Sequence, residues 1–191
     1  MKRGTLLTVA SMTFLLGATH VSLGNVLVNP GFETGSLNPW FLDSAPGPEP
    51  WNVTSAEVHS GMFSVTGVGN QRLTQMFAPI STALITEVSF WILQPDTSSG
   101  YAGYFYYEDG SEEQVGTFFP PNGLPNWTFV DMTSELDIGK NLIGFGVWGY
   151  AGGGPFEDRT YLDDLRVIPA PGSVALLGLS GLFVRRRRRR Q

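Results

Sequence analysis

The chain has 191 residues and a formal net charge of −5, with no cysteine, two histidines, 24 glycines and 13 prolines. This length suits one well-buried domain with appendages, and the lack of cysteine excludes disulfides, Cys-ligated metals and thiol catalysis. All 17 acidic residues lie in the segment from Glu33 to Asp164. Only four basic residues lie between Arg3 and Arg185, so this body carries a formal charge of −13 and offers no basic face to nucleic acid.

The N-terminus has the pattern of a secretory signal. Lys2 and Arg3 precede an apolar run from Leu6 to Ala18, and small residues follow it before residue 25. A buried first helix is the alternative, but a charged start and a short apolar run favour export. We therefore expect a signal peptide over residues 1–24 and a mature chain that starts near Asn25.

The body, residues 25–168, shows no helical period of apolar residues. Short runs rich in β-branched and aromatic residues recur between glycine, proline and asparagine, and Asp109-Gly110 predicts a hairpin turn. Many short strands in one all-β domain favour a two-sheet β-sandwich of the jelly-roll type. The expected strands are Val26–Val28, Asn52–Val58, Phe63–Val68, Arg72–Phe77, Leu84–Leu93, Tyr101–Glu108, Gln114–Phe119, Trp127–Asp131, Asn141–Tyr150 and Thr160–Val167.

Three segments carry a resemblance to a known fold family. They are Asn25-Val-Leu-Val-Asn-Pro-Gly-Phe-Glu-Thr-Gly35 followed by Trp40, His59-Ser-Gly-Met-Phe-Ser64, and Thr160-Tyr-Leu-Asp-Asp-Leu-Arg-Val167. Together they resemble the opening, the second turn and the closing strand of galactose-binding-like jelly-roll domains, which include several families of carbohydrate-binding modules. The resemblance implies that the closing strand pairs beside the first.

The same resemblance implies a structural calcium site where the three segments converge. Glu33 and Asp163 match the side chains of the pattern, and Gly31 and a residue near Ser60 would add carbonyl oxygens. Calcium prefers such oxygen ligands. Strand alternation predicts that the side chain of Asp164 points to the opposite face. The alternative is that these acids are exposed charges on an acidic domain.

Strand alternation also predicts a ligand-binding face. In the strand that ends at Tyr150, one face carries Ile143, Phe145 and Val147, which we expect in the core, and the other alternates Gly144 and Gly146 with aromatic residues. We expect an open floor on which a neutral sugar ring stacks, although these aromatic residues could instead fill a second core layer. The candidate ligand-binding residues are Trp91, Tyr104, Tyr106, Trp148 and Tyr150.

No motif points to catalysis. Glycan hydrolysis needs two carboxylates that face one cleft, and the acidic residues around Asp109 fit a solvated turn better. His59 could serve a Ser–His–Asp arrangement, but it already has a structural role in its turn. We therefore expect no enzyme, and carbohydrate binding leads as the function. The alternatives are a structural component of an extracellular polymer or biofilm and, less favoured, a small glycan hydrolase.

Residues 169–191 have the order of a sorting tail. The motif Pro169-Ala170-Pro171 precedes an apolar run over residues 173–184 and six arginines at 185–190. At about 1.5 Å per residue the run is short for a membrane core of about 30 Å, and the arginines place its end on the cytoplasmic side. The tail resembles the PEP-CTERM signal of exosortase-bearing Gram-negative bacteria, with Ala170 where that family usually has glutamate. The resemblance implies transient anchoring in the inner membrane, cleavage by an exosortase, and a final location at the cell envelope, on the cell surface or outside the cell.

Overall fold

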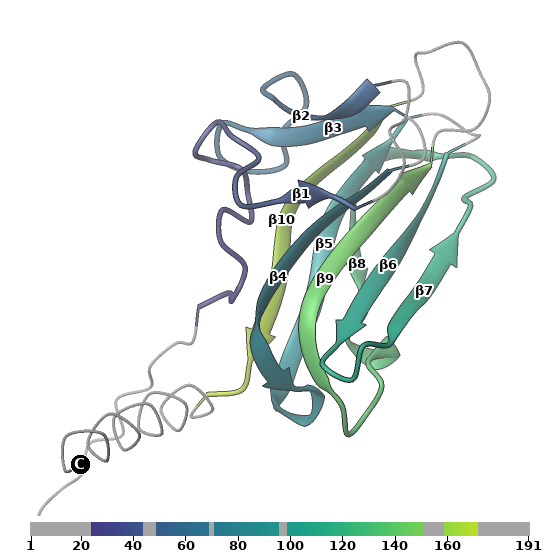
Figure 1. The fold of residues 1–191 in the computed structure, drawn as a ribbon. Helices are drawn as coiled ribbons and strands as arrows, with labels where there is room; N and C mark the ends of the chain where they lie inside the picture. Colours follow the sequence, from purple (N-terminus) through teal and green to yellow (C-terminus); the bar gives the residue numbers. More distant parts are fainter. Residues whose placement is uncertain (1–23, 44–48, 69–70, 96–98, 151–158, 172–191) are drawn as a thin grey trace, which may run out of the picture.

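The computed structural model describes residues 24–43, 49–68, 71–95, 99–150 and 159–171, which form a sandwich of two five-stranded antiparallel sheets (Figure 1). The predicted all-β two-sheet fold is therefore confirmed. The sheet that faces the viewer in Figure 1, here called the front sheet, has the strand order β1-β4-β9-β6-β7. Its strands are β1 (Phe41–Leu42), β4 (Gln71–Ser81), β9 (Asn141–Tyr150), β6 (Gly100–Tyr107) and β7 (Glu112–Phe118).

The back sheet has the strand order β2-β3-β10-β5-β8. Its strands are β2 (Glu49–Thr54), β3 (Ser64–Val68), β10 (Thr160–Pro169), β5 (Ile85–Gln94) and β8 (Leu124–Asp131). Two short 3-10 helices, η1 (Thr82–Leu84) and η2 (Thr133–Glu135), lie in the connections β4–β5 and β8–β9. Within the described ranges, no helix has the length and apolar character needed to cross a membrane. Residues 1–23 of the predicted signal peptide and the apolar run 173–184 lie outside these ranges.

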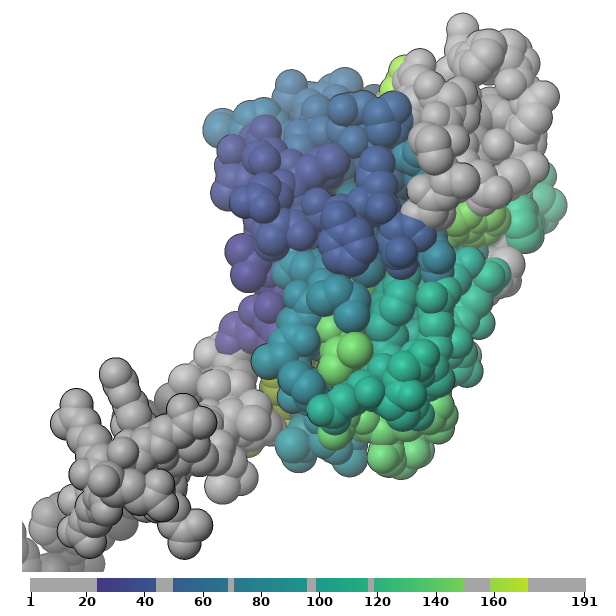
Figure 2. All heavy atoms as spheres, in the orientation of Figure 1, coloured from purple at the N-terminus to yellow at the C-terminus, as the bar shows by residue number. Residues whose placement is uncertain are grey.

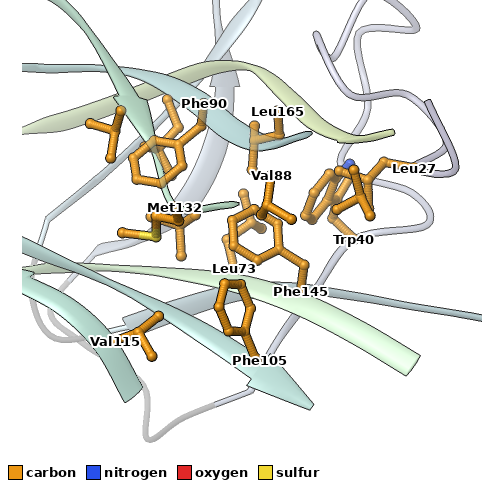
Figure 3. Packing of buried hydrophobic residues seen from close by; sticks show 14 of the residues in the cluster. Leu27, Trp40, Leu73, Val88, Phe90, Phe105, Val115, Met132, Phe145 and Leu165 are labelled. Carbon is orange, nitrogen blue, oxygen red and sulfur yellow. The ribbon is translucent and has the colours of Figure 1, made fainter. Parts of the chain in front are cut away.

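The core lies between the inner faces of the two sheets (Figure 3). The back sheet contributes Val88 and Phe90, which are fully buried, and the front sheet contributes Phe105 and Phe145. The Phe145 ring centroid lies 5.9 Å from that of Phe105 and 6.3 Å from that of Phe90. This aromatic packing holds the sheets together and leaves their outer faces available for other roles.

Two local predictions meet different outcomes. The Asp109-Gly110 hairpin is present: Tyr107 N–H donates to the Ser111 carbonyl at 2.9 Å, and Gly110 has a φ of +83° that favours glycine. In β9, by contrast, the assignment of Ile143 to the core is wrong. The pairing of β6 with β9 skips Ile143, which is half-buried, whereas Leu142 is fully buried. A bulge of one residue breaks the alternation there.

The predicted first strand, Val26–Val28, is not a strand. Its one backbone bond to β10 runs from Val26 N–H to the Val167 carbonyl at 3.0 Å. The side chain of Asn25 instead clamps β10, because its amide donates to the Leu165 carbonyl at 2.5 Å and its oxygen accepts from Val167 N–H at 2.9 Å. Leu165 N–H also donates to the Pro30 carbonyl at 3.1 Å. The opening segment therefore lies beside the closing strand through the Asn25 side chain and two isolated backbone bonds, while β10 pairs with β3 and β5.

Candidate functional site

Three segments that are distant in the sequence meet on the outer face of the back sheet at Asp163. His59 and Ser60 donate their backbone N–H groups to Asp163 Oδ2 at 3.0 and 3.1 Å. A Cβ atom at Gly31 would lie 3.5 Å from Oδ1 of Asp163 and 3.5 Å from Oδ1 of Asp164. Gly31, Ser60 and Asp163, three of the four residues predicted to bind calcium, are therefore neighbours in the fold.

The prediction that Asp164 points away from this group is wrong. The pairing of β10 with β5 shifts register between Asp163 and Arg166, and Asp164 has a φ of +49°. This bulge turns the Asp164 carboxylate toward the same loops as that of Asp163. Its Oδ2 lies 2.7 Å from His59 Nδ1, and its Oδ1 accepts from the Ser60 hydroxyl at 3.0 Å.

The carboxylate of Glu33 binds the loop that contains His59 and Ser60. It accepts the backbone N–H groups of Met62 at 3.0 and 3.1 Å and of Phe63 at 3.1 Å. The turn between them depends on Gly61, which has a φ of +70° and where a Cβ atom would lie 2.3 Å from Glu33 Oε1. Glu33 therefore holds the turn that follows His59 and Ser60.

The acidic group has the chemistry of a cation site. This acidic group consists of His59, Asp163 and Asp164, and one ligand atom of each lies within 4.8 Å of the others. Asp163 is fully buried, and this burial raises its pKa to about 6, against the effect of the backbone N–H groups that favour the charged form. The nearby Asp164 carboxylate raises the pKa of Asp163 further. Buried, adjacent carboxylates of this kind fit an oxygen-preferring divalent cation, and calcium binding itself stays a prediction.

The candidate ligand-binding aromatic residues do not share one face. Trp91 lies on β5 of the back sheet, and its ring stacks on His59 with centroids 3.8 Å apart and an angle of 17°. Tyr104, Tyr106 and Trp148 lie on the outer face of the front sheet (strands β6 and β9). Strand alternation distinguishes the two faces of a strand but does not assign the strand to a sheet. Tyr150 ends β9, and its side chain lies outside what the structure describes.

The tyrosines of the front sheet are tied into a polar network around Arg72. The Arg72 guanidinium lies 4.5 Å from the centroid of the Tyr104 ring and covers one face of it. It also donates to the carboxylate of Glu112 and, at 3.0 Å, to the backbone carbonyl of Asp43. The Tyr106 hydroxyl donates to the Asp43 carboxylate, and burial together with this bond raises the Tyr106 pKa. The network supplies charged hydrogen-bonding groups beside aromatic rings.

The glycine floor of this face is covered rather than open. A Cβ atom at Gly144 would lie 2.3 Å from Met76 Sδ, and one at Gly146 would lie 2.6 Å from Thr74 Oγ1. The glycines therefore make room for side chains of β4. Trp148 lies opposite Arg72 of β4 and Ala102 of β6, and its ring meets Phe119 at 6.2 Å. In Figure 2, which shows this face, green atoms of β9 are visible between those of β4 and β6.

Strand alternation missed Arg72, Asp43 and Glu112 as parts of this face. The available signal was Arg72 itself, one of only four basic residues in a body of −13. An arginine in such an acidic chain is expected to attract carboxylates. Its partners come from the end of β1 and the start of β7, which no local pattern relates.

The Pro169-Ala170-Pro171 motif continues directly from the sandwich. Pro169 is buried as the last residue of β10 and pairs with Ile85, and Ala170 N–H donates to the Leu84 carbonyl at 2.5 Å. Pro171 is exposed and is the last residue that the structure describes. The arginine block lies outside the described ranges.

Solved carbohydrate-binding modules share this fold. The chain aligns with a family 61 module in complex with β-1,4-galactotriose at a TM-score of 0.52 and 21% identity, covering 76% of this chain and 99% of that one. A family 28 module specific for non-crystalline cellulose aligns at 0.53 and 14% identity, covering 80% and 99%. A family 16 module aligns at 0.52 and 14% identity, covering 75% and 99%. No protein-family model and no curated protein matches the sequence. At these identities the likeness establishes a jelly-roll sandwich of the kind found in carbohydrate-binding modules.

Proposed function

We propose that the protein is a non-catalytic carbohydrate-binding module that binds a neutral glycan on the outer face of the front sheet. The observation that carries this proposal is the Trp148 ring beside the Arg72 network, in a fold shared with carbohydrate-binding modules. Trp148 is half-buried, and its neighbour Phe119 is 53% exposed. Aromatic rings with a few placed polar groups are the usual lining of small-ligand sites.

The two kinds of residue on this face have different roles in the proposal. Trp148 and Phe119 offer apolar ring surface to a sugar. Tyr104 has one face under Arg72, and its hydroxyl donates to Gln114 Oε1 at 2.6 Å, so it positions polar groups rather than stacking. Arg72, Glu112 and Gln114 then bind sugar hydroxyls, which both donate and accept hydrogen bonds.

The test is affinity electrophoresis and calorimetry on residues 25–171 with a panel of neutral oligosaccharides: β-1,4-galactotriose, xylohexaose and soluble cello-oligosaccharides. The probes follow the ligands named for the structural neighbours. Binding that Trp148→Ala weakens at least tenfold supports the proposal. The absence of binding to every probe leaves a structural polymer component as the better function, and release of reducing sugar from a bound probe identifies a hydrolase.

We also propose that calcium stabilises the module at the acidic group on the back sheet. Glu33, Asp163 and the carbonyls of Gly31 and Ser60 would hold it, and the bulge adds the carboxylate of Asp164. A bound divalent cation would offset the repulsion between adjacent carboxylates. Its role is structural, since none of these residues lies on the front sheet.

Export and sorting complete the proposal. The signal over residues 1–24 would lead the module out, and the tail from Pro169 would hold it at the inner membrane until an exosortase cleaves near the motif. Pro169 pairs with Ile85 and the Ala170 N–H donates to the Leu84 carbonyl, whereas Pro171 is exposed. Pro171 is therefore the residue of the motif that we expect an exosortase to reach. Cell fractionation of the full-length chain tests this step independently of glycan binding.

A further inference from the structure

A hollow of about 280 Å³ lies on the outer face of the back sheet, on the opposite side of the sandwich from Trp148. Its volume is near the lower limit of the range of about 300–1,000 Å³ for small-molecule sites, so it suits one small ring. Leu93, which is 6% exposed, pairs with Tyr161 and contributes apolar surface. The lining residues include Glu57, Leu93, Pro125, Asn126, Trp127 and Tyr161.

A bulge in β8 builds one wall of this hollow. Ile92 of β5 pairs with Thr128, but Gln94 pairs with Leu124, so β8 contains two more residues than β5 between these pairs. Pro125, Asn126 and Trp127 lie in this bulged stretch and all line the hollow. Bulges re-aim side chains and are frequent beside functional sites.

The Trp127 side chain, which lines the hollow, is held by contacts with neighbouring residues. The Trp127 ring meets His59 edge-on with centroids 5.7 Å apart, and His59 in turn stacks on Trp91. His59 Nδ1 lies 2.7 Å from Asp164 Oδ2. These contacts hold the Trp127 ring in place before any ligand binds, which lowers the entropic cost of binding.

The polar groups of the hollow are available to a ligand. Within the described part of the chain, no residue forms a hydrogen bond with the carboxylate of Glu57, the side-chain amide of Asn126 or the hydroxyl of Tyr161. A carboxylate accepts from two hydroxyls, and an amide both donates and accepts. Glu57 also lies two residues before His59 and near the acidic group, so negative charge disfavours uronic acids and sulfated sugars here.

We propose that this hollow is a second saccharide site, which takes one neutral sugar ring against Trp127 and Tyr161. The proposal rests on the proposed function in that both sites bind neutral glycans. Because the sites lie on the outer faces of opposite sheets, a short oligosaccharide cannot reach both at once. The module therefore binds two glycan segments and bridges polysaccharide chains.

Calorimetry of residues 25–171 with the same neutral oligosaccharide panel tests the proposal. We expect two sites per chain in the parent, one in Trp127→Ala, one in Trp148→Ala and none in the double variant. Phe129→Ala is the control for losing an aromatic side chain of β8. Phe129 is 45% exposed and packs on Trp91 with centroids 5.4 Å apart, but it does not line the hollow, so both sites should remain. An oligogalacturonide of similar length should not bind in the hollow, because Glu57 lines it.

A second variant protects the test against unfolding. Glu57→Gln with Asn126→Ala changes only exposed side chains and should weaken the second site at least tenfold while thermal melts stay unchanged. Two sites retained in both Trp127→Ala and the polar variant overturn the inference. One parent site that only Trp148→Ala removes overturns the inference and leaves the proposed function intact, whereas no binding to any probe overturns both.

Discussion

Replacing Trp148 with alanine tests whether this side chain binds glycan or belongs to the core. Trp148 is half-buried on the outer face of β9, so Trp148→Ala removes surface contacts without opening a cavity between the sheets. Full burial of a large apolar side chain contributes about 1.5–3 kcal/mol, so we expect a loss of about 1–2 kcal/mol. Binding of the neutral probes should weaken at least tenfold.

Trp51 is the matched control for this experiment. It is 2% exposed, its indole N–H donates to the Gln71 carbonyl at 3.3 Å, and its ring packs against Gly67 and Gly149. A Cβ atom at those glycines would lie 2.8 and 2.9 Å from the ring. Trp51→Ala leaves a cavity and removes the indole hydrogen bond to the Gln71 carbonyl, so it should cost about 3–5 kcal/mol.

The assay is urea titration of both variants beside affinity electrophoresis. We expect opposite patterns: a small stability loss with lost binding for Trp148→Ala, and a large stability loss for Trp51→Ala. A loss above about 3 kcal/mol for Trp148→Ala would place that ring in the core. Unchanged binding to every probe would remove Trp148 from the site.

Three further predictions concern the cation and the tail. Calcium at a hundredfold excess over its dissociation constant should stabilise the domain by about 2.7 kcal/mol relative to chelator, and Asp163→Ala should abolish this difference in thermal melts. The difference should be complete above about pH 7 and shrink as the pH falls through about 6, where Asp163 takes up a proton. In chelator the pH dependence of stability that Asp163 contributes has the opposite sign. Its raised pKa makes the folded state lose stability as the pH rises from about 4 to about 6. Equal melts with and without calcium at every pH would contradict the calcium site. Truncation after Pro171, which preserves β10, should release the chain to the medium, and neutral residues at 185–190 should weaken retention; equal fractionation of all three chains would refute the sorting tail.

Local patterns predicted much of the sandwich. Alternation of apolar residues identified most strands and correctly placed Phe145 and Val147 in the core, because an uninterrupted strand has a side-chain period of two. The Asp-Gly pair correctly placed the β6–β7 hairpin, because a turn depends on neighbouring residues alone. The resemblance of three short segments to one fold family correctly predicted that Gly31, Ser60 and Asp163 are neighbours.

Only the tertiary structure decided which faces these residues occupy. The bulge at Asp164 added a carboxylate to the acidic group. The bulge in β9 placed Leu142, rather than the predicted Ile143, in the core. Trp91 lies on the back sheet, where its ring stacks on His59, whereas Trp148 lies on the front sheet. The physical reason is that the sheet a strand joins, and the register in which it pairs, depend on partners dozens of residues away, and one inserted residue reverses the side chains that follow it.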